Sequence, residues 1–367
     1  MLIEIHMLKN YGPANLNRDD TNAPKTCMFG GVPRARISSQ CLKRSWRTSE
    51  LFREEIGSSL LGIRTRKLPD LVGEELTRRG LSDKEIEGVK KNLTGIGNKN
   101  SKATEDGKTK QIILYSPEDI TVLADTIERK LKNGEKISTK DLEAELKKDS
   151  KRSLSVDMAL FGRMVTSDAF ADVEASMQVA HAVSTNKVYM ESDYFTAVDD
   201  LIFGGSDDSG SAMIGDVDYN SSCYYIYGSV DTAKLMDNLS GHENAKEITN
   251  ALIKTLIKTM AFANPSGKQN TFAAHSLPSA ILIECKDVNI PVSYINGYEE
   301  AAYASREGGL ISNSIRKLAR EVQKIQEGYG LPVCKRLWFN TEGITLKLSG
   351  TEVCTSLMDM LERLPEV

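Results

Sequence analysis

The first residues of the chain alternate between apolar and polar side chains. In residues 3–7, apolar side chains occupy every second position, and Glu4 and His6 lie between them. A period of two is typical of a β-strand with one buried face. The same alternation, or a run of strand-forming residues, predicts further extended segments at residues 32–38, 173–179 and 223–227.

Helical spacing is found in other segments. The tripeptide SPE at residues 116–118 has proline at the first helical position, and apolar residues then follow helical spacing up to Asn133. Ser240 and Glu243 have the spacing of a capping box, which predicts the start of a helix that contains residues 248–256. Apolar residues at 311–325 predict another helix, which ends at Gly328.

A long hairpin is expected near the middle of the chain. Tyr194 and Phe195 precede the Gly-, Ser- and Asp-rich residues 204–211, and the chain returns through the strand expected at 223–227. Residues 51–155 are polar and helical, so they are expected to form a separate helical lobe. The pattern as a whole predicts an α+β fold with a helical insertion and a β-hairpin.

Composition limits the class of protein. The chain has 367 residues, of which 40% are hydrophobic and 27% charged, and this is typical of a folded soluble protein. Its apolar runs are shorter than the roughly 18 residues that span a bilayer, and its first residues do not resemble a signal peptide. We therefore expect a cytoplasmic protein with no membrane partner. Six scattered cysteines, without a C-x-x-C pair, favour reduced thiols over a disulfide framework or a zinc site.

The net charge of −4 is unusual for a nucleic-acid-binding protein, but the charge is unevenly distributed. Residues 18–47 contain seven basic residues against two acidic ones, a local charge of +5. The acidic pair is Asp19 and Asp20, and the basic residues are Arg18, Lys25, Arg34, Arg36, Lys43, Arg44 and Arg47.

The geometry of this segment favours an anion as ligand. In the extended part, Arg34, Arg36 and Ser38 share one face of the strand. Ser39 is expected to cap a helix that begins at Gln40. At 100° per residue, one arc of this helix contains only polar and basic side chains, namely Gln40, Lys43, Arg44 and Arg47. Since a helix N-terminus itself attracts phosphate, the pattern predicts a phosphate-backbone site, and the alternative is a solvated basic face.

Candidate catalytic residues are few. The four histidines are far apart in the sequence and form no metal-ligand spacing, and His181 is interpreted as a structural histidine in an apolar strand. The sequence contains no P-loop, no dinucleotide-binding glycine pattern and no G-x-S-x-G. Asp19 and Asp20 could hold a divalent metal beside the basic segment. The alternative for these acids is that they cap a turn or pair with Arg18.

Eight short motifs are long enough to compare with known families. They are LNRDD (16–20), FGG (29–31), RISSQ-x-LKR (36–44), GRMVTS (162–167), AHA (180–182), DYFTAVDDL (193–201), KQNTFAA (268–274) and GYGL (328–331). In this order they resemble the CasC family, the guide-binding backbone subunit of the type I-E CRISPR Cascade complex. Residues 55–150 match poorly.

The resemblance implies a hand-shaped protein with a modified RNA-recognition-motif (ferredoxin-like) palm. The palm would comprise residues 1–54, 156–188 and 226–367, with a helical finger insertion at 55–155 and a β-hairpin thumb at 189–225. Copies of the chain would stack head to tail along the guide crRNA, and each thumb would displace one base. The remaining bases would pair with the target DNA strand. The other partners implied are the CasA, CasB, CasD and CasE types of Cascade subunit.

The resemblance also implies roles for individual residues. Arg18, Lys25, Ser38, Gln40, Lys43, Arg44 and Arg47 would contact guide phosphates, in the basic segment that also contains Arg34 and Arg36. Met164 would lie beside the displaced nucleotide. Tyr194, Phe195 and Thr196 would lie where the thumb meets the guide–target duplex, with Tyr194 in place of the tryptophan common in the family. Met and aromatic side chains offer stacking surfaces that tolerate any base.

Three functions follow as hypotheses. The first is a non-catalytic guide-RNA scaffold in a DNA-targeting complex, without cofactor or catalytic metal. The second is a metal-dependent ribonuclease centred on Asp19 and Asp20, because backbone subunits of related type III complexes use an acid in the corresponding loop to cut target RNA. The third is a single-strand RNA-binding protein that works alone.

Overall fold

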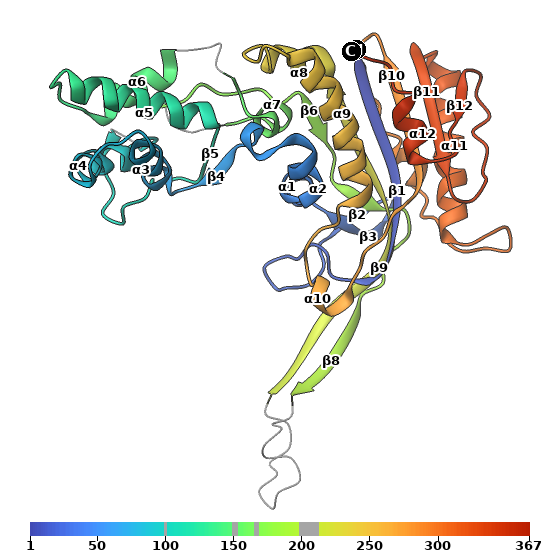
Figure 1. Cartoon of the computed structure of the whole chain (residues 1–367). Helices are drawn as coiled ribbons and strands as arrows, with labels where there is room; N and C mark the ends of the chain where they lie inside the picture. The colour runs from blue at the N-terminus through green and yellow to red at the C-terminus, as the bar shows by residue number, and fades with distance from the viewer. Residues whose placement is uncertain (99–100, 149–152, 165–168, 198–212) are drawn as a thin grey trace, which may run out of the picture. The chain divides into compact units, whose positions relative to one another are not determined.

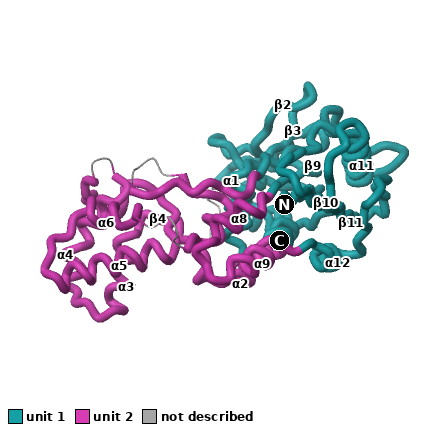
Figure 2. The backbone as a smooth tube through the Cα atoms, turned by 90° about the horizontal axis from the view of Figure 1, so that it is seen from above, with its two compact units in different colours: residues 1–49, 179–229, 256–365 teal, residues 50–178, 230–255, 366–367 magenta. Residues whose placement is uncertain are grey.

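The chain divides into two compact units, which Figure 2 shows in teal and magenta. The structure, a computed structural model, describes residues 1–98, 101–148, 153–164, 169–197 and 213–367. Unit 1 contains residues 1–49, 179–229 and 256–365, and unit 2 contains residues 50–178, 230–255 and 366–367. The boundaries of these units differ from those of the expected palm and finger, because residues 156–178 and 230–255 group with the helical insert.

Unit 1 is built on a mixed β-sheet with the strand order β12-β11-β10-β1-β9-β7-β3-β2 (Figure 1). Its central pairs, β1 with β10 and β10 with β11, are antiparallel, whereas β11 and β12 are parallel. The strands are β1 (Leu2–Ala14), β2 (Thr26–Phe29), β3 (Val32–Ile37), β7 (Ala182–Ser184), β8 (Glu191–Ala197), β9 (Met213–Asp231), β10 (Pro278–Lys286), β11 (Val333–Asn340) and β12 (Thr351–Val353).

Strand β1 is buried on both faces. The alternation in residues 3–7 predicts one buried face, and this is wrong: Glu4 and His6 are as fully buried as the apolar residues beside them. Their polar face is buried because the neighbouring strands supply charged partners. Glu4 pairs with Lys286 of β10, and Glu284 of β10 pairs with Arg336 of β11 at 2.6 Å. These matched charges allow a polar face to lie inside the unit.

His6 lies between these two ion pairs. Its Nδ1 is 2.7 Å from Tyr225 Oη, and its ring stacks against Tyr227 with 5.0 Å between centroids. Burial, and then the positive charges of Lys286 and Arg336, lower the pKa of His6 to about 3. His6 is therefore a neutral structural histidine at physiological pH.

The helices of unit 1 include α11 (Leu310–Tyr329), which packs on the face of the sheet that contains Leu8 and Trp338. This helix ends later than the sequence predicts, with Gly330 in the left-handed conformation as its C-cap. The other helical elements are α1 (Ser39–Thr48), α10 (Gln269–Phe272), α12 (Leu357–Glu362) and the 3₁₀ turn η3 (Ile295–Tyr298). Helix α9 (Ala245–Phe262) crosses the boundary between the units.

Unit 2 is mainly helical, as the sequence predicts. Helix α5 starts at the predicted proline, with Ser116 as its N-cap and a capping box with Asp119. The capping box expected at Ser240 is wrong, because α8 ends before this serine and α9 begins after it, at Ala245. The elements are α2 (Glu50–Ile56), η1 (Ser58–Leu60), β4 (Ile63–Thr65), α3 (Leu68–Arg78), α4 (Asp83–Thr94), β5 (Ile113–Tyr115), α5 (Pro117–Lys132), α6 (Thr139–Lys148), α7 (Val156–Phe161), β6 (Met177–Val179) and α8 (Thr232–Asn238).

The predicted α+β fold class is confirmed. A large mixed sheet and a helical cluster with its own apolar core occur in one chain. Within the described residues, the chain has no helix with the length and apolar composition needed to cross a membrane.

Candidate nucleic-acid interface

Helix α1 begins one residue earlier than expected, and Ser38 caps it. The Ser38 hydroxyl accepts a hydrogen bond from the Cys41 backbone N–H at 3.3 Å. The Ser38 backbone N–H donates to Asn17 Oδ1 at 2.8 Å, which joins the preceding loop to the start of the helix. Ser39 is therefore not the cap. Ser38, expected to contact a phosphate, is buried and its hydroxyl is used by the helix.

One face of α1 is basic, as the sequence predicts. We call Gln40, Lys43, Arg44 and Arg47 the basic stripe. Leu42 and Trp46 form the buried face of the helix, whereas Gln40 and Arg44 are exposed. Burial lowers the pKa of Lys43, so its ammonium group has lost part of its hydration. The first turn of α1 contains no acidic residue, so its free amides and the stripe together favour an anion.

The loop before α1 is organised by Asp19. Its Oδ1 accepts hydrogen bonds from the Thr21 N–H at 2.9 Å, the Thr21 hydroxyl at 2.7 Å and the Ala23 N–H at 3.1 Å. These hydrogen bonds lower the pKa of Asp19, and the bond from the Thr21 hydroxyl has the largest effect. The carboxylate therefore has the turn-capping role that the sequence leaves open as an alternative. Asp20 is exposed.

This loop and α1 enclose a hollow of about 560 Å³. Two cations, Arg18 and Arg44, line it together with Asp19. Its polar lining is completed by Asn17, Asn22, Ser45, Thr48, Ser49, Asn264 and Ser266. The structure thus brings Arg18 and Arg44 to one surface, and this surface is large and polar enough for part of a nucleotide.

The far wall of the hollow is segment 263–267, which β1 holds in place. Buried Lys9 donates to the Ala263 carbonyl at 3.0 Å, and Tyr11 donates to Asn264 Oδ1 at 2.8 Å. A Cβ added at Gly267 would lie 2.4 Å from the Leu16 carbonyl oxygen, so only glycine fits there. Burial lowers the pKa of Lys9 to about 7.

Arg34 is not a phosphate ligand, and this prediction is corrected. Its side chain is fully buried, and its guanidinium donates to five backbone carbonyls. These belong to Phe29, Ser184, Thr185, Tyr298 and Glu299, at 2.7–3.2 Å. Arg34 therefore connects three segments of unit 1. A guanidinium with five donors suits such a site better than an ammonium group would.

Arg36 and Lys25 lie together beside His181. The Arg36 guanidinium is 2.9 Å from His181 Nδ1, and the Arg36 backbone N–H donates to the Lys25 carbonyl at 2.8 Å. Partial burial, and then the charges of Arg36 and Lys25, lower the pKa of His181. The interpretation of His181 as part of an apolar strand is wrong, because its side chain is exposed and lies beside these cations.

Strand β8 and the first part of β9 form an exposed antiparallel hairpin, which extends away from the other strands of unit 1 (Figure 1). Its register pairs Tyr194 with Asp216, Phe195 with Gly215 and Thr196 with Ile214. Tyr194 and Thr196 therefore share one face, and Phe195 lies on the other, over Gly215. The three residues do not form a single contact surface. The expected tip at 204–211 lies outside the described residues.

Met164 of unit 2 is 92% exposed, which is unusual for a methionine. The residue before it is fixed: Arg163 pairs with Asp119 at 2.7 Å and lies over the Phe170 ring. An added Cβ at Gly162 would lie 2.8 Å from the Val173 carbonyl oxygen. The GRM part of the motif thus presents an apolar side chain on a rigid support. The remaining motif residues, 165–167, lie outside the described residues.

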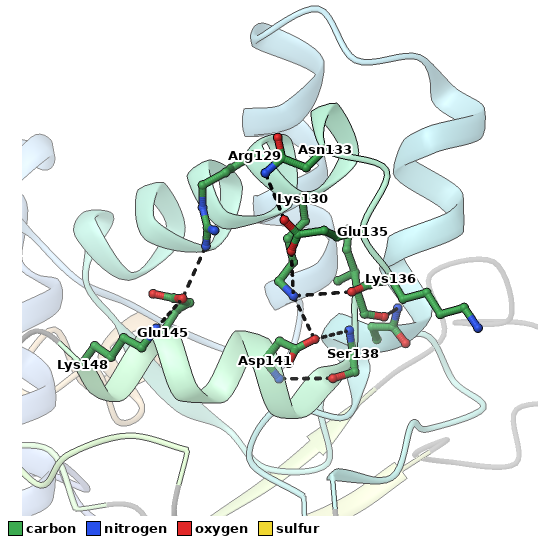
Figure 3. Close-up of polar contacts among 11 residues, drawn as sticks. Arg129, Lys130, Asn133, Glu135, Lys136, Ser138, Asp141, Glu145 and Lys148 are labelled. Atoms are coloured by element: carbon green, nitrogen blue, oxygen red, sulfur yellow. Dashed lines mark hydrogen bonds and ion pairs between the residues drawn. The ribbon is translucent and has the colours of Figure 1, made fainter.

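Several cations of the helical insert form ion pairs. Figure 3 shows contacts between and within α5 and α6, where Arg129 of α5 and Lys148 of α6 both reach Glu145 of α6, at 3.4 and 2.8 Å. Lys130 of α5 pairs with Asp141 of α6 at 3.1 Å. Neighbouring carboxylates thus neutralise these three cations.

The remaining candidate ligands are dispersed. All six cysteines are free, and His242 bonds the Leu154 carbonyl at 2.8 Å. In the part of the chain that the structure describes, no three His, Cys, Asp or Glu side chains group as metal ligands.

Sequence reasoning missed the residues that connect the loop to the rest of unit 1. Buried Asn15 donates to the Asn22 carbonyl at 3.0 Å and to the Asp218 carbonyl at 2.8 Å, so it links the loop to the base of the hairpin. Asn17 holds the start of α1, and Lys9 holds the wall of the hollow. A lysine inside an apolar strand was a usable signal for Lys9, whereas asparagines in a loop are too common to stand out.

Comparisons with known proteins place the chain in a family. A family model described as CT1975-like protein matches residues 3–363. No curated protein matches the chain. A solved structure titled "CRISPR RNA-guided surveillance complex, pre-nicking" contains a similar chain, with 24% identity, a TM-score of 0.80 and 99% coverage of both chains. Another, titled "CRISPR RNA-guided surveillance complex", has 21% identity, a TM-score of 0.62 and 99% coverage of both chains. At these identities the two likenesses show a shared fold over the full length.

Proposed function

The chain belongs to the CT1975-like family of Cas proteins, and on this premise we propose that it is the non-catalytic backbone subunit of a CRISPR Cascade surveillance complex. In this role, copies of the chain stack head to tail along a guide crRNA. They hold its phosphates without regard to sequence and present its bases in segments to the target DNA strand. The partners are the guide, further copies of the chain and the CasA, CasB, CasD and CasE types of subunit.

The observation that carries the proposal is the basic stripe at the capped start of α1. The stripe joins a hollow that Arg18 and Arg44 line, and Arg36 and Lys25 extend the positive surface beside His181. Cations and free amides recognise phosphates, which are the same in every guide. A subunit that accepts any spacer needs this kind of contact, because base pairing supplies the sequence specificity.

The proposal also assigns a role to each part of the chain. The antiparallel core of the unit 1 sheet serves as a palm of the RNA-recognition-motif type, the helical insert as a finger and the β8–β9 hairpin as a thumb. Tyr194 on one face of the hairpin and Phe195 on the other give it one exposed aromatic side chain on each face. A two-sided hairpin suits insertion between neighbouring nucleotides. Exposed Met164 offers a similar surface beside a displaced base.

The ribonuclease alternative is less well supported. A metal-dependent nuclease needs carboxylates that are free to coordinate the ion. The Asp19 Oδ1 atom already accepts three hydrogen bonds within its own turn. The other acid of this loop, Asp20, is exposed and would have to supply the metal ligand. A protein that binds single-stranded RNA alone would use the same stripe, and it differs from the proposal by forming no stack.

Salt dependence of guide binding tests the proposed mode of recognition. Filter binding of the purified chain to two guides of unrelated sequence, at several salt concentrations, is the measurement. We expect affinities that agree within about threefold and fall together, with equal slopes, as salt increases. Tight binding to one guide only, or a flat salt dependence, would contradict phosphate recognition.

A further inference from the structure

The hollow beside α1 is lined by polar groups of different kinds. Arg18 and Arg44 supply positive charge, which suits a phosphate. The other polar side chains of the lining are neutral, except for the carboxylate of Asp19. A carboxylate repels a phosphate, but it accepts a hydrogen bond from a hydroxyl group. The two arginines therefore suit one part of a ligand, and the rest of the lining suits an uncharged polar part.

Several of these groups have unused hydrogen-bonding capacity. The hydroxyl of Ser266 and the side-chain amide of Asn22 are exposed, and within the described residues they form no hydrogen bond. Asn17 uses its Oδ1 atom to hold the start of α1, and its Nδ2 group has no partner in the described ranges. The Oδ2 atom of Asp19 is likewise unused there, since the three hydrogen bonds of its turn all reach Oδ1. The hollow thus offers both donors and acceptors to a ligand.

Segment 263–267, which contributes Ser266 to the hollow, is supported from both sides. Strand β1 holds its first residues, as described above. On the other side, Gln269 of the KQNTFAA motif donates from Nε2 to the Pro265 carbonyl at 2.8 Å and to the Ala274 carbonyl at 3.2 Å. The Ser266 hydroxyl therefore lies on a fixed wall, and a preformed site loses little entropy when a ligand binds.

The same motif contains backbone strain. Lys268 and Ala273 flank helix α10 with φ angles of +51° and +45°, a region that residues with a Cβ rarely adopt. Phe272 lies against Tyr219 of β9, with 5.5 Å between the ring centroids. Strain of this kind is frequent at binding sites, where surrounding contacts fix one conformation. The KQNTFAA motif thus supports the wall of the hollow.

A ribose hydroxyl has the chemistry that these groups require. The 2′-hydroxyl of RNA both donates and accepts a hydrogen bond, and DNA lacks this group. Serine and asparagine side chains supply donors and acceptors, and the Asp19 carboxylate supplies a further acceptor. Contacts to phosphate alone would not distinguish RNA from DNA, because the two backbones carry the same charge.

We infer that the hollow beside α1 binds the ribose 2′-hydroxyl of a guide nucleotide, and that Ser266 and Asn22 make this site selective for RNA over DNA. Arg18 and Arg44 bind the adjoining phosphates. The volume of about 560 Å³ has room for a sugar and a phosphate together. This inference rests on the proposed guide binding, and it adds the chemical feature by which the chain recognises a guide as RNA.

Filter binding of matched oligonucleotides to the purified chain tests the inference. Four probes share one sequence and one length: RNA, DNA, 2′-O-methyl RNA and 2′-fluoro RNA. The fluoro group keeps the sugar conformation of RNA but cannot donate a hydrogen bond. The probes therefore separate recognition of the hydroxyl from recognition of the sugar conformation.

Two variants each remove one hydrogen-bonding group from the hollow. Ser266→Ala deletes only the hydroxyl. Asn22→Gly deletes the amide, and glycine readily adopts the φ of +69° at this position, so the turn keeps its conformation. Ser240→Ala, at an exposed serine of unit 2, is the matched control. Arg44→Ala serves as the comparison for a phosphate contact.

We expect the wild type to bind RNA at least about fivefold more tightly than the other three probes, which is the typical net effect of one hydrogen bond. Ser266→Ala and Asn22→Gly should each lower the affinity for RNA by about threefold to fivefold and leave the affinity for DNA unchanged. Arg44→Ala should weaken the binding of RNA and DNA by the same factor, and Ser240→Ala should bind as the wild type does.

The contrary outcomes are distinct. Equal affinity of the wild type for RNA and DNA would overturn the inference, and so would tight binding of 2′-fluoro RNA, because the chain would then recognise sugar conformation. Equal losses for RNA and DNA in Ser266→Ala and Asn22→Gly, or an unchanged RNA-to-DNA ratio in both, would show that these side chains do not confer selectivity. If the wild type binds none of the probes, the proposed function fails, and the inference fails with it.

Discussion

Residues 16–47 and the helical insert are both rich in Lys and Arg, but they use these residues differently. In the insert, helices α3–α6 place acids near the cations, as in the pairs Arg79–Glu75 at 2.9 Å and Arg129–Glu145 at 3.4 Å. In residues 16–47, Arg18, Lys25, Arg36 and Arg44 form no ion pair within the described ranges. One of the two acids there, Asp19, is used by a turn.

This difference shows that the number of basic residues in a region is a poor guide to anion binding. The partners of these residues within the chain decide whether they are available to an anion. On a helix surface, a cation that pairs with a neighbouring acid is neutralised by this acid. It therefore attracts anions from outside only weakly. Cations without an ion pair in the chain keep their positive field and attract anions from outside. This comparison assigns the guide to residues 16–47 and predicts little guide affinity from the paired cations of α5 and α6.

The largest effect expected concerns Arg34, a cation of the N-terminal segment whose guanidinium is bound by carbonyls of its own chain. Arg34→Met removes five hydrogen bonds to buried carbonyls, so we expect the free energy of unfolding to fall by about 3–5 kcal/mol. Arg44→Met, a matched change at an exposed position, is expected to cost less than about 0.5 kcal/mol. Urea denaturation of both variants is the measurement. Equal stability of the two would show that Arg34 is not structural.

The second effect comes from the buried charges of the sheet, which are paired internally like those of the insert. The pKa of His6 is about 3 in the folded chain and near 6.5 when unfolded, so the unfolded chain binds the extra proton between these values. The contribution of His6 is therefore complete above pH 6.5 and is lost as the pH falls towards 3. We expect the unfolding free energy to decrease by about 2 kcal/mol between pH 7 and 5.

Denaturation of the wild type and His6→Gln at both pH values checks this expectation. The variant has no group that titrates at this position, so its stability should change less over the same range. An equal decrease in both proteins would assign the pH dependence to other groups.

The third effect tests the comparison itself. Arg18→Ala and Arg44→Ala should each weaken guide binding by about tenfold for any spacer and make the salt dependence shallower by about one unit of slope. Arg129→Ala and Lys148→Ala, in the insert, should change guide affinity by less than about twofold. Losses of equal size in both regions would remove the distinction between paired and unpaired cations.

The smallest effect is expected for Asp20→Ala, which should not change the fate of a bound RNA. Complexes that contain Asp20→Ala should leave a bound complementary RNA as intact as wild-type complexes do, in the presence of magnesium. Gel analysis of the RNA is the assay. Regularly spaced cuts that occur with the wild type and vanish in the variant would support the ribonuclease alternative.

Local sequence patterns predicted much of the fold. Helix α5 and strand β3 have strong signals, a capped proline start and an extended run, and both occur where expected. The burial of Glu4 was not predictable from β1, because its partner Lys286 is far away in sequence. A period of two reports which residues share a face, but the partner strands decide whether that face is buried.

The candidate site shows the same limit. The basic face of α1 follows from helical spacing within a few residues, and the structure contains it. Arg34 and Arg36 look equivalent in sequence, as two arginines on one face of a strand. Arg34 is buried because carbonyls from residues 184–185 and 298–299 converge on it, and no local pattern contains that information.

The central claim is that the chain is a repeating subunit on a guide, and copy number against guide length tests it most directly. Native mass spectrometry of complexes reconstituted on guides of several lengths, each in two unrelated sequences, gives the number of chains bound. The account predicts that this number rises in regular steps with guide length and is the same for both sequences. A constant single copy, or a number that depends on sequence and not on length, would contradict it.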